Sequence, residues 1–387
     1  MLTIQDGAVR VLHVTLSSGP GGGPEHVFQL VSNLTDDVKN YIAAPDEYPY
    51  GKKYRKLVGE DNICLMPSRK FQLSSLWRLL RFVLKNEVDI IHSHGKGAGV
   101  YSRVVAFLTR RKSIHTFHGL HLNYRPTINA LYLLVEKVLG TLTSRFICVS
   151  SGERRVILDN GITSFNKVHV IVNGVAVSER RQLSPPTGRI FTVIQMTRFD
   201  FAKNTELLLD IAEILKEAGI LSSFRFVLLG EGEKKDECEK RSRELGVADA
   251  FLFAGYQENP RTWLQGGSPD QSVGQVGCYL TTSRWEGLPL SVLESMAEGI
   301  PVIASDVVGN NDIIKNNVTG LLYDLEDPHE AAERLVALSN DRSLWKKLSL
   351  NGQKLVAENY TVGQMARRTH KLYIQLMNSW GDCEYNN

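Results

Sequence analysis

The sequence lacks the features that mark secreted, zinc-binding or membrane-spanning proteins. Its five cysteines form no Cys-x-x-Cys pair and do not cluster with histidine, which gives no sign of a zinc site or a disulfide framework. No uncharged apolar run approaches the roughly 20 residues that a membrane-spanning helix needs. The N-terminus carries Asp6 and a short apolar run at 9–16, without the cationic start or cleavage site of a signal peptide. We therefore expect a reduced, cytoplasmic protein.

Motifs of several enzyme classes are also missing. The dinucleotide-binding spacing Gly-x-Gly-x-x-Gly fails, since Gly19 and Gly21 would need a glycine where Pro24 stands. No Walker loop, His-Glu-x-x-His segment or Ser/His/Asp order is present. The sequence thus gives weak support to NAD or FAD binding and none to ATP use or hydrolysis.

What the chain does contain is a regular alternation of apolar, β-rich runs with helical patterns. The runs lie at 9–16, 63–68, 88–94, 112–118, 145–150 and 167–175, and then at 191–197, 224–232, 250–256, 277–283, 301–306 and 319–324. Near-continuous apolar strands separated by helices predict parallel sheets covered on both faces, and two such series in 387 residues predict two domains. We expect an α/β protein with two Rossmann-like, doubly wound domains at 1–182 and 183–365, joined by a linker at 176–188.

The ends of the predicted strands are where binding residues are expected. Ligands of open parallel sheets bind beyond the carboxyl ends of the strands, so two such domains facing each other would enclose a central cleft.

The net charge of +3 conceals opposite charges in the two halves. Residues 1–182 carry 24 Lys and Arg against 14 Asp and Glu, and residues 183–387 carry 21 against 28. The basic residues gather at 52–85, which includes a cationic amphipathic segment with Trp77, and at 103–112. They predict attraction to an anionic inner-leaflet membrane surface or an anionic lipid-linked substrate; an ordinary surface helix is the alternative. Nucleic acid is disfavoured because no recognised nucleic-acid motif accompanies the charge.

The segment 284–299, RWEGLPLSVLESMAEG, predicts a helix from about Pro289 to Glu298. Pro289 suits a first helical turn, and Gly299 followed by Pro301 is a stop signal. The apolar stripe of this helix consists of Leu290, Leu293, Met296 and Ala297.

Two glutamates in this segment, Glu286 and Glu294, stand eight residues apart. Glu294 lies at the edge of the stripe, with Ser295 and Glu298 further out, so Glu294 is expected to be the carboxylate nearest the core and to bind a ligand diol. Glu286 stands at the mouth of the helix N-terminus, where N–H groups and the dipole favour a phosphate. The alternative is that both glutamates are solvated surface residues.

Three further loops carry candidate residues. Gly21–Gly23, before a helix expected to begin at Pro24, would let backbone approach a phosphate or sugar, unless they form a plain tight turn. His118 ends the fourth run beside a glycine and is a candidate for contact with a sugar or the reacting centre, although a lone histidine is usually structural. Arg198 and Lys203, five residues apart at a strand-to-helix turn, suit the two sides of a diphosphate; a solvated basic loop is the alternative.

Together these segments resemble the group 1 family of retaining glycosyltransferases with the GT-B fold, across nearly the whole chain. The resemblance rests on GGGPEHVFQL, DIIHSHGKGAG, HTFHG, FICVSSGERR, VHVIVNGV, MTRFDFAKN, FVLLGEGE and EGLPLSVLE, in that order. It implies sugar transfer from a nucleotide-diphosphate sugar, a UDP-sugar ahead of a GDP-sugar, with retained anomeric configuration and without a metal or cofactor. The implied acceptor is a hydroxyl of a lipid-linked saccharide or oligosaccharide in bacterial surface polysaccharide synthesis.

The resemblance also implies residue roles. Arg198 and Lys203 would neutralise the donor diphosphate and the leaving group, and Glu294 would hold the ribose hydroxyls. Glu286 would hold the donor sugar near its anomeric carbon. Donor-lining positions beside it are Gly287, Leu288, Pro289 and Leu290, and the opposite wall, near donor sugar and acceptor, is formed by His118 and the backbone of Gly22 and Gly23.

Some features leave alternatives open. The stretch 257–276 is longer than the family pattern and should border the base pocket, which leaves the base in doubt. A closing helix at 366–387 is expected to cross back to the first domain. A non-hydrolysing sugar-nucleotide epimerase has the same architecture and remains an alternative. A binding protein without catalysis is disfavoured, because such a protein would be expected to lack one of the four paired charges.

Overall fold

The computed structural model describes residues 8–120, 125–177, 183–267 and 273–384. The chain forms two compact units, unit 1 with Met1–Gly174 and Val362–Asn387, and unit 2 with Val175–Thr361. The divisions therefore lie at 174 and 361, where the sequence patterns suggested 182 and 365. Part of the expected linker, 178–182, lies outside the described residues.

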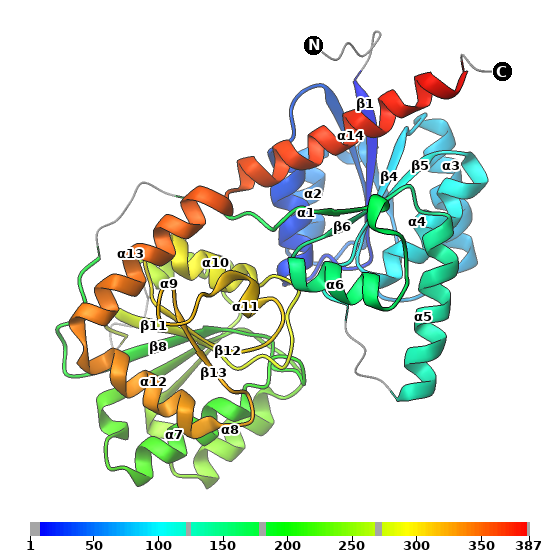
Figure 1. Ribbon diagram of the computed structural model, residues 1–387. Helices are drawn as coiled ribbons and strands as arrows, with labels where there is room; N and C mark the ends of the chain where they lie inside the picture. Colours follow the sequence, from blue (N-terminus) through cyan, green and yellow to red (C-terminus); the bar gives the residue numbers. More distant parts are fainter. Residues whose placement is uncertain (1–7, 121–124, 178–182, 268–272, 385–387) are drawn as a thin grey trace. The chain divides into compact units, whose positions relative to one another are not determined.

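Unit 1 contains a seven-stranded parallel sheet in the order β3-β2-β1-β4-β5-β6-β7 (Figure 1). Its strands are β1 Val9–Thr15, β2 Val38–Ala44, β3 Ile63–Leu65, β4 Ile90–His94, β5 Lys112–Thr116, β6 Arg145–Cys148 and β7 Val168–Val170. Strand β2 is absent from the sequence prediction. Its apolar run is interrupted by Lys39 and Asn40, yet its remaining residues are buried between β1 and β3.

Helices cover both faces of this sheet because successive strand residues point to opposite sides. The helices are α1 Gly22–Ser32, α2 Tyr50–Val58, α3 Leu73–Lys85, α4 Lys96–Thr109, α5 Pro126–Thr141, α6 Ser151–Asp159 and α14 Val362–Glu384. Val9 and Val11 of β1 share a core with α1 and α14, whereas Leu12 and Val14 share one with α3 and α4. Short 3-10 turns lie at Glu60–Asn62 and Phe165–Lys167.

Unit 2 contains a six-stranded parallel sheet in the order β10-β9-β8-β11-β12-β13. Its strands are β8 Phe191–Met196, β9 Phe224–Leu229, β10 Phe251–Gly255, β11 Val276–Thr281, β12 Val302–Ser305 and β13 Leu321–Tyr323. Its helices are α7 Glu206–Glu217, α8 Lys235–Glu244, α9 Arg261–Leu264, α10 Leu290–Ala297, α11 Asn310–Ile313, α12 Pro328–Asn340 and α13 Arg342–Asn359. Further 3-10 turns lie at Leu221–Ser223 and Ala248–Ala250.

The two strand orders confirm the predicted fold class of two Rossmann-like, doubly wound parallel sheets. In each sheet the order reverses at one point, between β1 and β4 in unit 1 and between β8 and β11 in unit 2. The loops that leave neighbouring strands at such a switch point diverge to opposite faces and leave room for a ligand at the carboxyl edge. The candidate residues should therefore lie beyond β1, β4, β8 and β11.

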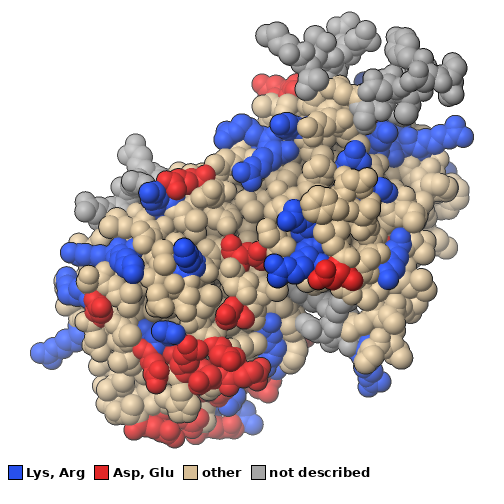
Figure 2. Space-filling model, in the orientation of Figure 1, with Lys and Arg blue, Asp and Glu red and all other residues tan. Residues whose placement is uncertain are grey.

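The surface reflects the uneven charge of the sequence. Figure 2 shows acidic side chains gathered over the part of unit 2 that contains α7, α8 and α12, while the visible face of unit 1 carries mainly Lys and Arg. None of the described helices combines the length and the apolar character that crossing a bilayer requires.

Candidate functional site

The loops that follow β8 and β11 adjoin, because these two strands are hydrogen-bonded neighbours in unit 2. Three contacts join the loops. The Arg284 N–H donates to the carbonyl of Ala202 at 2.8 Å, its guanidinium donates to the carbonyl of Phe201 at 2.9 Å, and the Thr282 hydroxyl donates to the carbonyl of Lys203 at 2.9 Å. Residues far apart in the sequence are thereby held in one place.

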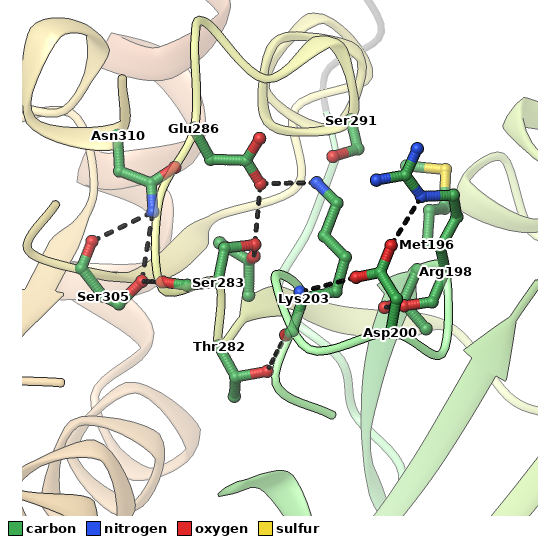
Figure 3. A network of polar contacts seen from close by, with 12 residues as sticks. Met196, Arg198, Asp200, Lys203, Thr282, Ser283, Glu286, Ser291, Ser305 and Asn310 are labelled. Atoms are coloured by element: carbon green, nitrogen blue, oxygen red, sulfur yellow. Dashed lines mark hydrogen bonds and ion pairs between the residues drawn. The ribbon is translucent and has the colours of Figure 1, made fainter. Parts of the chain in front are cut away.

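Lys203 and Glu286 meet at this junction (Figure 3). The Lys203 Nζ lies 2.5 Å from Glu286 Oε1, which also accepts a 2.6 Å hydrogen bond from the Ser283 hydroxyl. The two charged side chains are 21% and 11% exposed, so they are shielded but still reachable from solvent. The structure thus brings together two of the predicted residues, 83 positions apart.

Asp200 connects Arg198 to the same loop. Its Oδ2 accepts from Arg198 Nε at 2.9 Å, and its Oδ1 accepts from the Lys203 backbone N–H at 3.0 Å. The Arg198 side chain is 50% exposed and projects from the protein surface. Asp200 was not among the predicted site residues, although its place between two cations in MTRFDFAKN was a visible signal.

Buried hydrogen bonds hold the segment that carries Glu286. The Ser305 hydroxyl donates to the carbonyl of Ser283 at 2.6 Å, and the Asn310 amide donates to the carbonyl and hydroxyl of Ser305 at 3.0 and 3.2 Å. Gly309 has φ +93°, and a Cβ there would lie 2.7 Å from the Glu286 Cβ. Sequence reasoning missed these residues, because nothing in the sequence ties 305–310 to Glu286.

Helix α10 follows directly and matches the predicted helix within one residue at each end. Pro289 is its N-cap, and Gly299 adopts φ +77° just beyond its end. Gly287, Leu288 and Leu290 are buried around its N-terminus. The first N–H groups of a helix have no partner within it, which makes this end suitable for an anion.

The predicted orientation of the acids on α10 was wrong. Glu298 and Ser295, expected to point outward, are 2% and 0% exposed, whereas Glu294 is only partly buried. Glu298 forms an ion pair with Arg261 and accepts from Gln265 Nε2 at 3.1 Å. The reason is that α9 and α13 cover faces of α10 outside its apolar stripe, so a single stripe does not define what is buried.

The charges of Glu294 and Glu286 both influence Tyr279. Burial raises the pKa of Tyr279, and the negative charges of Glu286 and Glu294 raise it further. The Tyr279 hydroxyl donates to the hydroxyl of Ser291, one turn before Glu294, at 2.9 Å. Both glutamates thus lie near enough to Tyr279 for their charges to raise its pKa.

In unit 1, His118 lies in the loop after β5, in a left-handed backbone conformation with φ +59°. The next N–H, that of Gly119, donates to the buried carboxylate of Glu153, which also accepts from the Val149 N–H at 2.8 Å. Glu153 thus fixes the loop that carries His118. It belongs to the quoted segment FICVSSGERR, but no role was predicted for it.

His118 belongs to a cluster of imidazoles at the unit 1 switch point. Its Nε2 lies 3.4 Å from His94 Nδ1, the other nitrogen of His94 lies 3.3 Å from His13 Nδ1, and the ring of His26 lies 4.4 Å from that of His118. Burial lowers the pKa of His13 and of His26 to about 4, and it lowers the pKa of His94 and His118 well below the ordinary value. Burial thus disfavours the charged form of each of these imidazoles.

Two triplets in this cluster have ring nitrogens within 4.8 Å of one another, His13 with His92 and His94, and His26 with His94 and His118. Both nitrogens of His92 already face hydroxyls, of Tyr373 at 2.6 Å and Thr116 at 2.8 Å. The first triplet is thus accounted for as a hydrogen-bond network. The second is the better candidate for a metal, since His26 Nδ1 is buried with no hydrogen-bond partner among the described residues.

The glycine-rich turn lies beside this cluster. Helix α1 begins at Gly22, two residues before the predicted start at Pro24, and Gly21 caps it. A Cβ on Gly23 would meet nothing within 4 Å, so packing within the chain does not require glycine there. The open space suits the close approach of a ligand.

Two family models match consecutive parts of the chain. Residues 20–179 match Glycosyltransferase Family 4, and residues 178–355 match Glycosyl transferases group 1.

Individual proteins and structures give the same result. The putative glycosyltransferase EpsD of Bacillus subtilis is 30% identical, with 76% of this chain and 79% of EpsD covered. The UDP-Gal:alpha-D-GlcNAc-diphosphoundecaprenol alpha-1,3-galactosyltransferase of Escherichia coli is 24% identical over 82% of each chain. The crystal structure of HepE from Anabaena, in complex with UDP and glucose, superposes with a TM-score of 0.78 at 16% identity and covers 94% of this chain and 99% of HepE. That likeness shows the shared fold.

Proposed function

The chain belongs to the group 1 family of glycosyltransferases with the GT-B fold, and on this premise we propose that it transfers a sugar from a nucleotide-diphosphate sugar to an acceptor hydroxyl with retention of configuration. The observation that carries the proposal is the contact of Lys203 with Glu286 at the unit 2 switch point, with Arg198 joined to it through Asp200. A nucleotide-diphosphate sugar needs cations that bind its phosphates and a carboxylate that accepts hydrogen bonds from its hydroxyls.

Each charged group then has a role that its position allows. Lys203 and Arg198 neutralise the diphosphate and the charge that develops on it as the glycosidic bond breaks. Glu286, beside the N-terminus of α10, accepts hydrogen bonds from hydroxyls of the donor sugar. Glu294, further along α10, accepts hydrogen bonds from the two hydroxyls of the ribose.

In the proposed reaction the acceptor hydroxyl attacks the anomeric carbon from the face that the nucleotide leaves. The bond from that carbon to the diphosphate oxygen breaks, the new glycosidic bond forms, and the leaving phosphate oxygen takes the acceptor proton. Glu286 is not used as a glycosidase acid or nucleophile, because in this reaction the leaving phosphate takes the proton and no enzyme carboxylate bonds to the anomeric carbon. We expect no metal to be needed.

Donor and acceptor are inferred by analogy. HepE is named as a complex with UDP and glucose, and the Escherichia coli relative is named for UDP-Gal and a diphosphoundecaprenol acceptor. We propose a UDP-sugar donor and a lipid-linked acceptor in surface polysaccharide synthesis, which would place the enzyme in the cytoplasm at the inner membrane surface.

The test is a transfer assay with purified protein, a panel of UDP- and GDP-sugars and a water-soluble acceptor analogue. Lys203→Ala and Glu294→Ala should each reduce donor binding or turnover about tenfold or more, because a charge-assisted contact contributes roughly 1.5–3 kcal/mol. Lys240→Ala, at an exposed lysine of the same unit, is the control and should leave activity unchanged. Full activity in either site variant would refute the assignment, and epimerised sugar formed without acceptor would indicate an epimerase.

A further inference from the structure

The outer helices of unit 1 expose an unusual amount of apolar surface. Most of the large apolar side chains that are exposed among the described residues lie on three consecutive helices, α3, α4 and α5, or just before them. We call this set the apolar face: Phe71, Leu73, Trp77, Leu84, Phe107, Leu108, Ile128, Leu131, Leu134, Val135 and Val138. Exposed apolar side chains gathered on neighbouring helices in this way indicate a site of interaction.

Helix α5 shows the pattern most clearly. Ile128, Leu131, Leu134, Val135 and Val138 recur at helical spacing and are 40–61% exposed. The opposite side of α5 also packs inward, with Leu139 buried and Tyr132 and Leu133 against the core formed around Phe146. The outward stripe is therefore additional to the side that the core requires.

The three helices belong to one layer. Helix α4 packs against both α3 and α5, and Figure 1 shows them along the same side of the unit 1 sheet. The Lys96 ammonium lies 4.5 Å from the ring centre of Tyr132, which fixes the start of α4 against α5.

The exposed charges of these three helices are positive. The helices, 13, 14 and 16 residues long, contain a single acidic residue, Glu136, which is turned inward and paired with the buried Arg103. The same three helices and their adjoining residues carry exposed cations, namely Lys70, Arg78, Arg81, Lys85, Arg110, Arg125 and Lys137. Exposed apolar side chains together with cations suit the boundary between lipid headgroups and acyl chains.

We propose that the apolar face docks unit 1 on an anionic bilayer, with the α5 stripe and Trp77 in the headgroup region and these exposed cations on lipid phosphates. The inference rests on the proposed function in one respect, the lipid-linked acceptor. A second copy of the chain is a poorer occupant, because a two-fold contact brings the same positively charged surface of both copies together. A bilayer has no such repulsion, since its surface charge is negative.

The test is flotation of the full-length protein with vesicles of phosphatidylglycerol and phosphatidylcholine in equal parts, against vesicles of phosphatidylcholine alone. The protein should float with the anionic vesicles at low salt and less well at high salt. Leu131→Asp combined with Leu134→Asp should weaken flotation about tenfold or more, because apolar area is lost and negative charge is added. The matched control is Leu350→Asp, at a leucine of unit 2 that is 54% exposed, which should float like the unchanged protein.

Transfer to a water-soluble acceptor separates this inference from the proposed function. The Leu131→Asp, Leu134→Asp protein should keep that activity, since neither leucine belongs to the site. Activity without flotation of the unchanged protein would overturn the docking proposal and leave the transferase proposal standing. Equal flotation of the double variant and the Leu350→Asp control would also overturn docking. A dimer that dissociates in the double variant, without vesicle binding, would assign the face to a second copy.

Discussion

The buried ion pair that orients α5 offers a direct test of how this part of the molecule is held. Arg103 Nη1 and Nη2 lie 2.8 and 3.1 Å from the two oxygens of Glu136, and Arg103 Nε donates to the carbonyl of Gly99 at 2.8 Å. The side chains are 0% and 2% exposed. Every charge of the pair is thus compensated inside the protein, and removing one partner leaves the other without water.

Arg103→Met is the informative change. It preserves the apolar stem but leaves the Glu136 carboxylate buried without its cation, which should destabilise unit 1 by about 3–5 kcal/mol. For a unit of this size such a loss lowers Tm by about 6–20 °C. Arg103→Met combined with Glu136→Leu should recover most of the loss, because a well-packed apolar pair of similar volume is often as stable as a buried ion pair.

Differential scanning calorimetry measures both variants and can resolve the two units if they unfold separately. Arg10→Met is the control in the same unit, because the Arg10–Glu87 pair is 39% and 69% exposed and a solvent-exposed pair contributes little to stability. An Arg103→Met protein as stable as the unchanged chain would refute the reasoning. A double variant no more stable than Arg103→Met would show that packing, and not the uncompensated charge, sets the loss.

Three further predictions concern the site and its surroundings. Gly309→Ala should reduce transfer about tenfold or more, because its new Cβ would displace Glu286. The control is Gly219→Ala, which is also at positive φ but has open space around it, and it should only lower stability by about 1 kcal/mol. Equal transfer activity of the two variants would contradict this prediction. Burial lowers the pKa of His13 and of His26 to about 4 in the folded protein. As the pH falls below 6.5, the unfolded chain therefore binds protons before the folded protein does, and Tm should drop between pH 6.5 and 4. A Tm that does not change over this range would contradict the burial of these histidines. Dialysis against EDTA should leave transfer unchanged. Activity lost to EDTA and restored by zinc alone would instead show that transfer requires zinc, for which the triplet of His26, His94 and His118 is the candidate site.

The fold was largely predictable because its strands are buried on both faces. Buried parallel strands must be apolar along their whole length, so runs such as those of β8 and β11 stand out in the sequence. Strand β2 was not predicted because the polar residue Asn40 interrupts its apolar run, and Asn40 is satisfied by a tertiary contact, in which His13 Nε2 donates to its Oδ1 at 3.1 Å. Such a partner is invisible to a local pattern.

The site was predictable where it follows from strand ends and less so where it depends on packing. Lys203 and Glu286 each follow a strand, and neighbouring strands bring them together. The orientation of Glu294 and Glu298 depends on which helices cover α10, and one apolar stripe cannot reveal that. The exposed stripe of α5 was not predicted for a related reason, since an apolar helix has the same composition whether it is buried or faces outward.

The two switch points differ in charge. Unit 2 presents paired ions, Lys203 with Glu286 and Arg198 with Asp200, whose side chains stay partly exposed. Unit 1 presents buried imidazoles, and burial lowers the pKa of His94 and of His118. The imidazoles are engaged with one another, since His94 contacts His118 through Nδ1 and His13 through Nε2. Charge is therefore retained where the side chains reach solvent, and neutral polar groups are found where they are largely buried, because an ionised group is costly to bury without a partner.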